Sequence, residues 1–134
     1  MSADRISLTV PSRPEYAKAV RMTASALASR MGATYEDLDD IRIAAEELFV
    51  YACDQTGTAG DVAMVFIIGE GDIAMSVRLA EGVRATGEDV ERRAAYATFI
   101  LQAVSDHYEL SSDSEGRHLM VRKRLGVEPD DAGS

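Results

Sequence analysis

Apolar and polar residues alternate strictly at the start of the chain. Ile6, Leu8 and Val10 share one face and polar residues share the other, which predicts a half-buried strand over residues 5–10. After two prolines the period changes, and apolar residues recur every three or four positions as far as Gly32. This spacing predicts a helix that the glycine ends.

A second helix is predicted to begin at Thr34. Ile43, Phe49 and Val50 widen its apolar stripe, so we expect it to be buried on more than one side. The elements predicted after it are a turn at 55–60, strands at 62–68 and 73–79, a helix at 88–105 and strands at 107–110 and 117–125. This order is typical of a two-layer α+β sandwich whose antiparallel-rich sheet carries the helices on one face.

Composition adds limits on size and partners. The 134 residues are 46% apolar and carry a formal charge of −9, which predicts one domain over residues 1–126 and a short, acidic, disordered tail over 127–134. An acidic balance disfavours nucleic acid and anionic membranes as partners. No apolar run approaches the roughly 20 residues of a membrane span, and the start of the chain has no leader pattern. With a single cysteine, Cys53, the chain fits a reducing cytoplasm.

Catalytic patterns are scarce. His107 and His118 are the only histidines and have no third ligand at metal spacing, so we expect no metal site. Glu47 is more unusual, because it lies one helical turn from Ile43 and from Tyr51 and so borders an apolar surface. Desolvation would raise the pKa of such a carboxylate, as a general base requires. The alternative is an ordinary solvated helix face.

Several stretches of the first 55 residues are similar to a known family. They read Val-Pro-Ser-Arg-Pro-Glu-Tyr from Val10, Val-Arg-Met-Thr from Val20, Ala-Ser-Arg-Met-Gly from Ala28 and Ile-Arg-Ile-Ala-Ala-Glu-Glu from Ile41. They resemble the anti-sigma-factor serine-protein kinases of the RsbW type, which act in bacterial stress response and sporulation. Beyond residue 55 the resemblance is only in the order of elements. It implies the GHKL (histidine kinase-like ATPase) fold, a two-layer α/β sandwich with a mixed sheet and helices on one face.

The resemblance also implies an ATP–Mg²⁺ site made of three motifs. The first is a helical glutamate, the base, followed four residues later by a metal-binding asparagine. Glu47 matches the glutamate, but Tyr51 stands at the metal position. A phenol is a poor ligand for Mg²⁺, which prefers hard oxygen ligands in strict octahedral geometry.

The other two motifs depart further from the family. In Asp-x-Gly-x-Gly, whose aspartate recognises adenine, Ala80 replaces the aspartate and only Gly82 remains. The Gly-rich phosphate turn is replaced by good helix formers, namely Ala94, Ala95 and Ala97. The loop over residues 81–88 is also short for a lid. We therefore expect a degenerate member without nucleotide cofactor, metal or catalysis, in which Glu47 is a vestigial base.

The first half of the family pattern is intact. The resemblance makes Arg21 an anchor for protein partners, although an ordinary solvated arginine is the alternative reading. The expected function is an anti-sigma-like pseudokinase that regulates transcription by sequestering a sigma factor or its antagonist through partner switching. A homodimer using the first strand and helix is also implied. One alternative is an active kinase that uses Mg-ATP and Glu47 to phosphorylate an antagonist serine, and another is a scaffold for dimer assembly.

Overall fold

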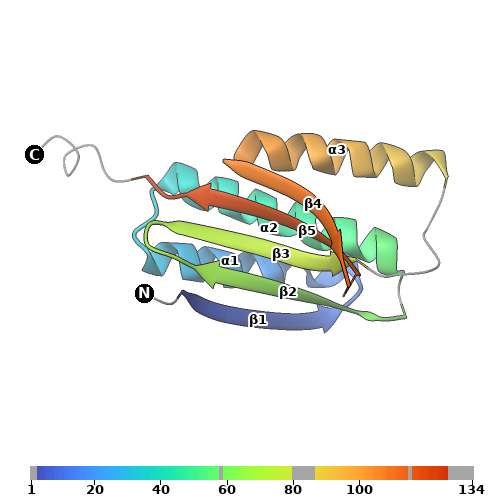
Figure 1. Cartoon of the computed structure of the whole chain (residues 1–134), viewed down its shortest axis with the longest axis horizontal. Coiled ribbons are helices and arrows are strands. Elements are labelled where there is room, and N and C mark those ends of the chain that lie inside the picture. Colours follow the sequence, from blue (N-terminus) through green and yellow to red (C-terminus); the bar gives the residue numbers. More distant parts are fainter. Residues whose placement is uncertain (1–2, 58, 80–86, 115, 127–134) are drawn as a thin grey trace, which may run out of the picture.

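The computed structural model describes residues 3–57, 59–79, 87–114 and 116–126. Its elements follow the predicted order. They are β1 (Asp4–Pro11), a 3-10 turn (Pro14–Tyr16), α1 (Ala17–Arg30), α2 (Tyr35–Thr56), β2 (Asp61–Ile68), β3 (Asp72–Leu79), α3 (Glu88–Val104), β4 (His107–Asp113) and β5 (Gly116–Arg124). Figure 1 shows these elements along the chain. The tail predicted over 127–134 lies outside the described residues.

The five strands form one sheet in the order β1-β2-β3-β5-β4. Every pair of neighbours is antiparallel, which corrects the expectation of a mixed sheet. The reason lies in the connections. Two helices return the chain to the end of β1, so β2 runs back along it, whereas the single helix α3 makes β4 parallel to β3. Because β5 lies between β3 and β4 and pairs antiparallel with each, these two parallel strands are not hydrogen-bonded to each other.

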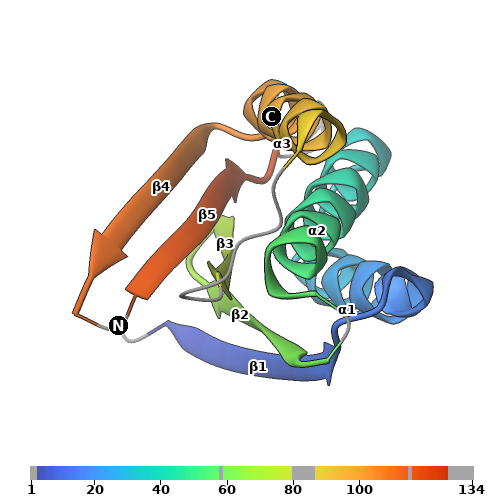
Figure 2. The ribbon, with the colours of Figure 1, turned by 90° about the vertical axis from the view of Figure 1, so that its right-hand side faces the viewer.

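All three helices cover the same face of the curved sheet, with α2 between α1 and α3 (Figure 2). The α+β sandwich with helices on one face is therefore confirmed. The core between the layers takes alternate residues of each central strand and the inner stripe of each helix. Its largest fully buried members are Phe49, Phe66, Ile41, Leu48, Met64, Ile73, Met75, Leu79, Leu101 and Leu119.

The middle helix α2 is buried on more than one side, as expected, and Phe49 is fully buried. Ile43 departs from the expectation, because its side chain is 42% exposed. This exposure places Ile43 on the outer surface of α2. The apolar stripe thus continues beyond the core onto the surface.

The end of β5 is attached to the start of α2 by a largely buried polar cluster. Thr34 caps α2 by accepting the backbone N–H of Asp37 at 3.1 Å. The Asp37 carboxylate accepts the N–H of Gly126 at 2.7 Å. Lys123 Nζ lies 3.8 Å from Asp37 Oδ1 and 3.2 Å from Asp40 Oδ2. Sheet and helix layer are therefore joined by charge as well as by the apolar core.

Within the described residues, no helix combines the length and apolar character needed to cross a lipid bilayer.

Candidate functional site

A cleft of about 410 Å³ lies between α2 and α3. The two helices run antiparallel, so that the last turns of α2 face the first turns of α3 (Figure 1). The cleft is lined by Glu47, Val50, Tyr51 and Asp54 from α2 and by Arg92, Arg93, Tyr96 and Ala97 from α3. Three residues singled out by sequence, Glu47, Tyr51 and Ala97, therefore lie together in one cleft.

Glu47 is a carboxylate of this cleft that has no partner in the described part of the chain. Among the described residues, no hydrogen bond or ion pair reaches its side chain. Burial raises the pKa of Glu47 above its ordinary value of 4.5, and the negative charge of Glu46 raises the pKa further. The cleft thus holds an acid whose charged form is destabilised by its surroundings.

The walls beside Glu47 are aromatic and aliphatic. Tyr51 follows Glu47 by one helical turn and packs partly against the core. Tyr96, across the cleft on α3, is 62% exposed. Val50 and the buried Ala97 complete the apolar lining. These residues can contact the apolar part of a ligand, while Glu47 supplies a charge.

Both arginines of the cleft already have carboxylate partners other than Glu47. Arg93 binds Asp54 through two contacts, Nε to Oδ2 at 3.0 Å and Nη2 to Oδ1 at 3.3 Å. The hydrogen bond and the charge of Asp54 raise the pKa of Arg93. Arg92 pairs with Asp89 at 3.3 Å along α3. Neither guanidinium neutralises Glu47.

The segment predicted to replace the Gly-rich turn lies inside a continuous helix. α3 begins at Glu88, directly after Gly87, so Ala94, Ala95 and Ala97 occupy its second and third turns. Backbone N–H groups within a helix donate to carbonyls four residues earlier and are not free to bind phosphate. Ala97 faces the cleft, whereas Ala95 is exposed. Ala80 and Gly82 lie outside the described residues.

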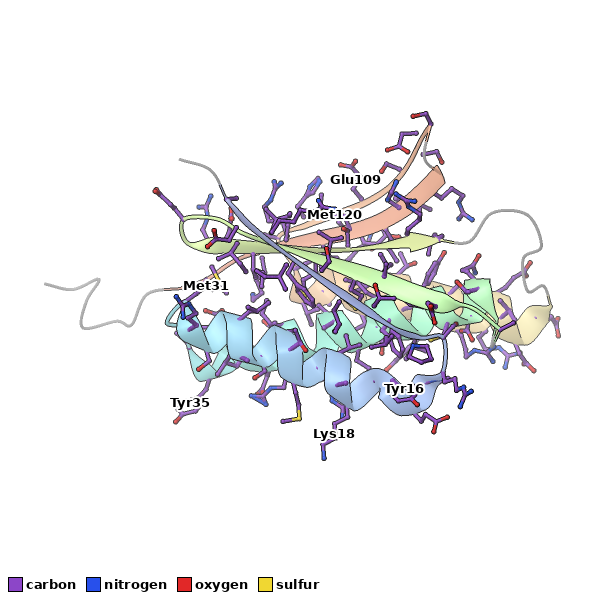
Figure 3. All side chains as sticks on the ribbon, turned by 90° about the horizontal axis from the view of Figure 1, so that it is seen from below. Tyr16, Lys18, Met31, Tyr35, Glu109 and Met120 are labelled. Atoms are coloured by element: carbon purple, nitrogen blue, oxygen red, sulfur yellow. The ribbon has the colours of Figure 1, made fainter. Side chains whose placement is uncertain are left out.

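Arg21 lies on the other side of α2, away from the cleft. It extends from α1 and pairs with Glu46 of α2, with 38% of the Arg21 side chain exposed. A shallow groove of about 570 Å³ runs beside it, lined by Lys18, Arg21, Met22, Ser25, Ala26, Ser29 and Arg42. Lys18 points away from the sheet in Figure 3, whereas Met120 and Glu109 lie toward the sheet side. The groove is therefore on the outer surface of the helix layer.

The sequence did not reveal every part of the cleft. Asp54 and Arg93 are 39 positions apart, and neither belongs to a motif. Tyr96 lies between Ala94 and Ala97 of the inner stripe of α3, and its partly exposed side chain lines the cleft. The sequence signal that could have pointed to this surface is the pair of aromatic residues off the inner stripe of α3, Tyr96 and Phe99. Large apolar side chains seldom gather on a surface without a function. The described residues contain no cluster of three or more metal-ligating side chains.

Comparison with known proteins finds serine-protein kinases named RsbW among the relatives of this chain. No protein-family model matches the chain. Serine-protein kinase RsbW of Bacillus pumilus is 36% identical over 74 residues, which cover 52% of this chain and 46% of that protein. Serine-protein kinase RsbW of Bacillus subtilis is 48% identical over 46 residues, covering 34% of this chain and 29% of that protein. In both, the chain spans less than half the length of the relative.

One longer match and one solved structure extend the similarity to most of the chain. Serine-protein kinase RsbW of Oceanobacillus iheyensis is 28% identical over 145 aligned positions, covering 96% of this chain and 91% of that protein. The crystal structure of the RsbU and RsbW domains of a Mycobacterium tuberculosis protein superposes with a TM-score of 0.71 at 16% identity. That match covers 93% of this chain and 33% of the other, and it shows a shared fold.

Proposed function

We propose that the chain, which is similar to the RsbW serine-protein kinases, is an anti-sigma-type regulator that binds its partners without using nucleotide. It sequesters a bacterial sigma factor in the cytoplasm by mass action, and an antagonist protein competes for the same surface. The partner is released by this competition and not by phosphorylation.

The observation that carries the proposal is the continuity of α3. The resemblance places the family's phosphate-binding turn, which needs free N–H groups and close backbone approach, at Ala94–Ala97. In this chain these residues lie within the regular hydrogen bonding of α3. Tyr51 also brings a phenol ring to the position where the family has a metal-binding amide. Both features act against a bound Mg-ATP.

The partner surface in this proposal is the groove beside Arg21. Its guanidinium is paired with Glu46 and is still partly exposed, so an incoming carboxylate can replace Glu46 without first desolvating a lone charge. Met22, which is 61% exposed, supplies an apolar contact next to it. An arginine beside an exposed apolar side chain is the composition of a binding hot spot.

A second candidate function, the active serine-protein kinase, is favoured by one observation. Glu47 has a raised pKa in a cleft, as a general base operating near neutral pH requires. In that case Mg-ATP would bind beside Glu47, and an antagonist serine would be phosphorylated.

Thermal unfolding with Mg-ATP separates the two functions. With 5 mM Mg-ATP the proposal predicts a melting temperature within about 1 °C of the nucleotide-free value, because only a bound ligand stabilises the folded state. A rise of several degrees would contradict the proposal and support the kinase.

The binding surface has a separate test. Arg21→Ala should weaken the affinity for the cognate sigma factor at least tenfold, measured by isothermal titration calorimetry. Arg30→Ala is the matched control, because Arg30 is an exposed arginine of the same helix outside the groove. Equal affinities for the parent and Arg21→Ala would remove Arg21 from the binding surface.

The proposal includes a homodimer built on the first strand. β1 lies at one edge of the sheet, and its side away from the helices carries Arg5, Ser7 and Thr9. These residues border a shallow depression of about 490 Å³ on the uncovered sheet face, whose centre holds Val65 and Ile67. A two-fold axis near β1 would cover this apolar centre.

A further inference from the structure

Among the residues that the structure describes, the Glu47 carboxylate has no compensating cation in its own cleft. Arg93 is held by Asp54 through two contacts, and Arg92 is held by Asp89. The remaining ionisable groups of the lining are the phenols Tyr51 and Tyr96. Glu46, the neighbour of Glu47 in sequence, faces α1 and is held by Arg21, so it does not compensate Glu47 either. The electrostatics of the cleft therefore favour a cation and disfavour an anion such as a phosphate.

The walls of the cleft suit a cation attached to an apolar stem. The faces of tyrosine rings attract ammonium and guanidinium groups, and Tyr51 and Tyr96 stand on opposite sides of the cleft. Val50 and Ala97 can contact methylene groups. Lysine and arginine side chains have this composition, a chain of methylenes that ends in a charge.

The surface around the cleft mouth fits a protein and not a small free amine. Phe99 is one helical turn beyond Tyr96 and is 67% exposed, and Ile43 is one turn before Glu47 and is 42% exposed. These two side chains extend the apolar surface beyond the volume that one side chain can fill. A partner covering them would bury the apolar area that anchors protein interfaces.

We propose that the α2/α3 cleft is a socket for a lysine or arginine side chain of the protein partner, which inserts between Tyr51 and Tyr96 and pairs with Glu47. This inference rests on the proposed function, which makes the partner a sigma factor. Arg21 of α1 and Glu47 of α2 then offer opposite charges on the two sides of α2. The partner presents an acidic side chain to Arg21 and a basic side chain to the α2/α3 cleft. Such a two-charge pattern fixes the register of the partner on the helix layer.

The socket can be tested on the chain alone with n-propylguanidinium chloride as the probe. The pKa of Glu47 is measured from its side-chain carboxyl carbon by NMR, with 200 mM of the probe or with sodium chloride at equal ionic strength. A cation that binds the ionised form lowers the pKa, and a dissociation constant of about 100 mM gives a fall of about 0.5. The carboxyl carbon of Glu70, exposed in the β2–β3 turn, is the internal control. A fall no larger than in sodium chloride would overturn the socket.

A second experiment uses the partner complex. Glu47→Gln and Tyr96→Ser should each weaken binding of the sigma factor about tenfold, whereas Tyr35→Ser should leave the affinity unchanged. Tyr35 is 89% exposed at the start of α2 and lies outside the cleft, so it controls for loss of a surface tyrosine. Unchanged affinity in Glu47→Gln, with binding lost in Arg21→Ala, would overturn the socket and leave the proposed function standing. A chain that binds no sigma factor but shows the fall in the pKa of Glu47 would overturn the proposed function and leave the socket standing.

Discussion

At the scale of single residues, the adjacent glutamates of α2 have different surroundings. Successive residues of a helix point about 100° apart, so Glu46 faces α1 and Glu47 faces α3. Glu46 pairs with Arg21, whereas Glu47 has no partner among the described residues. One dipeptide therefore serves two surfaces, and the charge of one member affects the ionisation of the other.

The raised pKa of Glu47 predicts how Glu47→Gln changes stability with pH. An acid whose pKa is higher in the folded chain takes up protons on folding. Its contribution to stability is complete below the ordinary pKa of 4.5 and is lost as pH rises through the raised value. Since glutamine does not ionise, Glu47→Gln should have a higher free energy of unfolding than the parent at pH 7, and the difference should shrink toward pH 4.

Urea denaturation at low protein concentration between pH 4 and pH 8 measures this difference. Glu70→Gln is the matched control for the replacement of a glutamate, because Glu70 is exposed in a turn. A Glu47→Gln difference that is constant with pH, or that grows on acidification, would contradict the desolvation of Glu47.

At the scale of elements, the three helices are attached to the sheet unequally. α2 contributes most of the buried helical side chains, whereas α3 buries only Ala97 and Leu101 among its described residues. The Asp54–Arg93 ion pair adds a polar contact between α2 and α3 to this limited apolar contact. The cleft thus forms where packing between helices is least complete.

The polar cluster at the start of α2 gives a prediction about stability. Asp37→Ala should lower the free energy of unfolding by about 2 kcal/mol, because Lys123 and the N–H of Gly126 lose a buried acceptor. Asp39→Ala is the control, and a change within about 0.5 kcal/mol is expected there since the Asp39 side chain is 71% exposed. Urea denaturation of both variants measures these free energies of unfolding. A similar decrease in the two variants would contradict the structural role of the cluster.

Much of the element order could be predicted from sequence because each signal is local. The alternation of Ile6, Leu8 and Val10 specifies a strand, and spacings of three and four specify helices, without knowledge of distant residues. Long-range placement could not be predicted in the same way. The insertion of β5 between β3 and β4 makes the sheet wholly antiparallel, and it depends on pairings such as Ser76 with Met120.

The candidate site was predictable only in part for the same reason. Glu47 and Tyr51 share a helix, so their spacing already placed them on one side of it. The wall that Arg93 and Tyr96 provide comes from another helix, and its distance from Glu47 depends on how α3 packs. Arg21 was predicted as an exposed anchor, but its pairing with Glu46 became visible only in the folded chain.

At the scale of the whole molecule, the described helices all cover one face of the sheet, and none of them covers the other (Figure 2). The two proposed partner surfaces, the groove beside Arg21 and the α2/α3 cleft, both lie on the helix layer. The uncovered sheet face, with Val65 and Ile67 at its centre, remains for a second copy of the chain. Dimerisation and partner binding would thus use opposite sides of the molecule and need not compete.

The proposed dimer predicts a solution mass of twice the 14.5 kDa monomer. Ser7→Glu combined with Thr9→Glu should reduce the mass to that of the monomer, because an isologous interface brings each new charge against its own copy. Gln102→Glu, which adds a charge to the exposed side of α3, should remain dimeric. Size-exclusion chromatography with light scattering measures all three proteins, and a double variant that stays dimeric would exclude β1 from the interface.

The central claim is a partner-binding protein that works without nucleotide. The most direct measurement is the dissociation constant for the sigma factor encoded in the same genome, determined by calorimetry with and without 5 mM Mg-ATP. The account predicts tight binding with the same dissociation constant in both conditions, since α3 leaves no free N–H groups for phosphates at Ala94–Ala97. Binding that requires Mg-ATP, or that fails in both conditions, would contradict it.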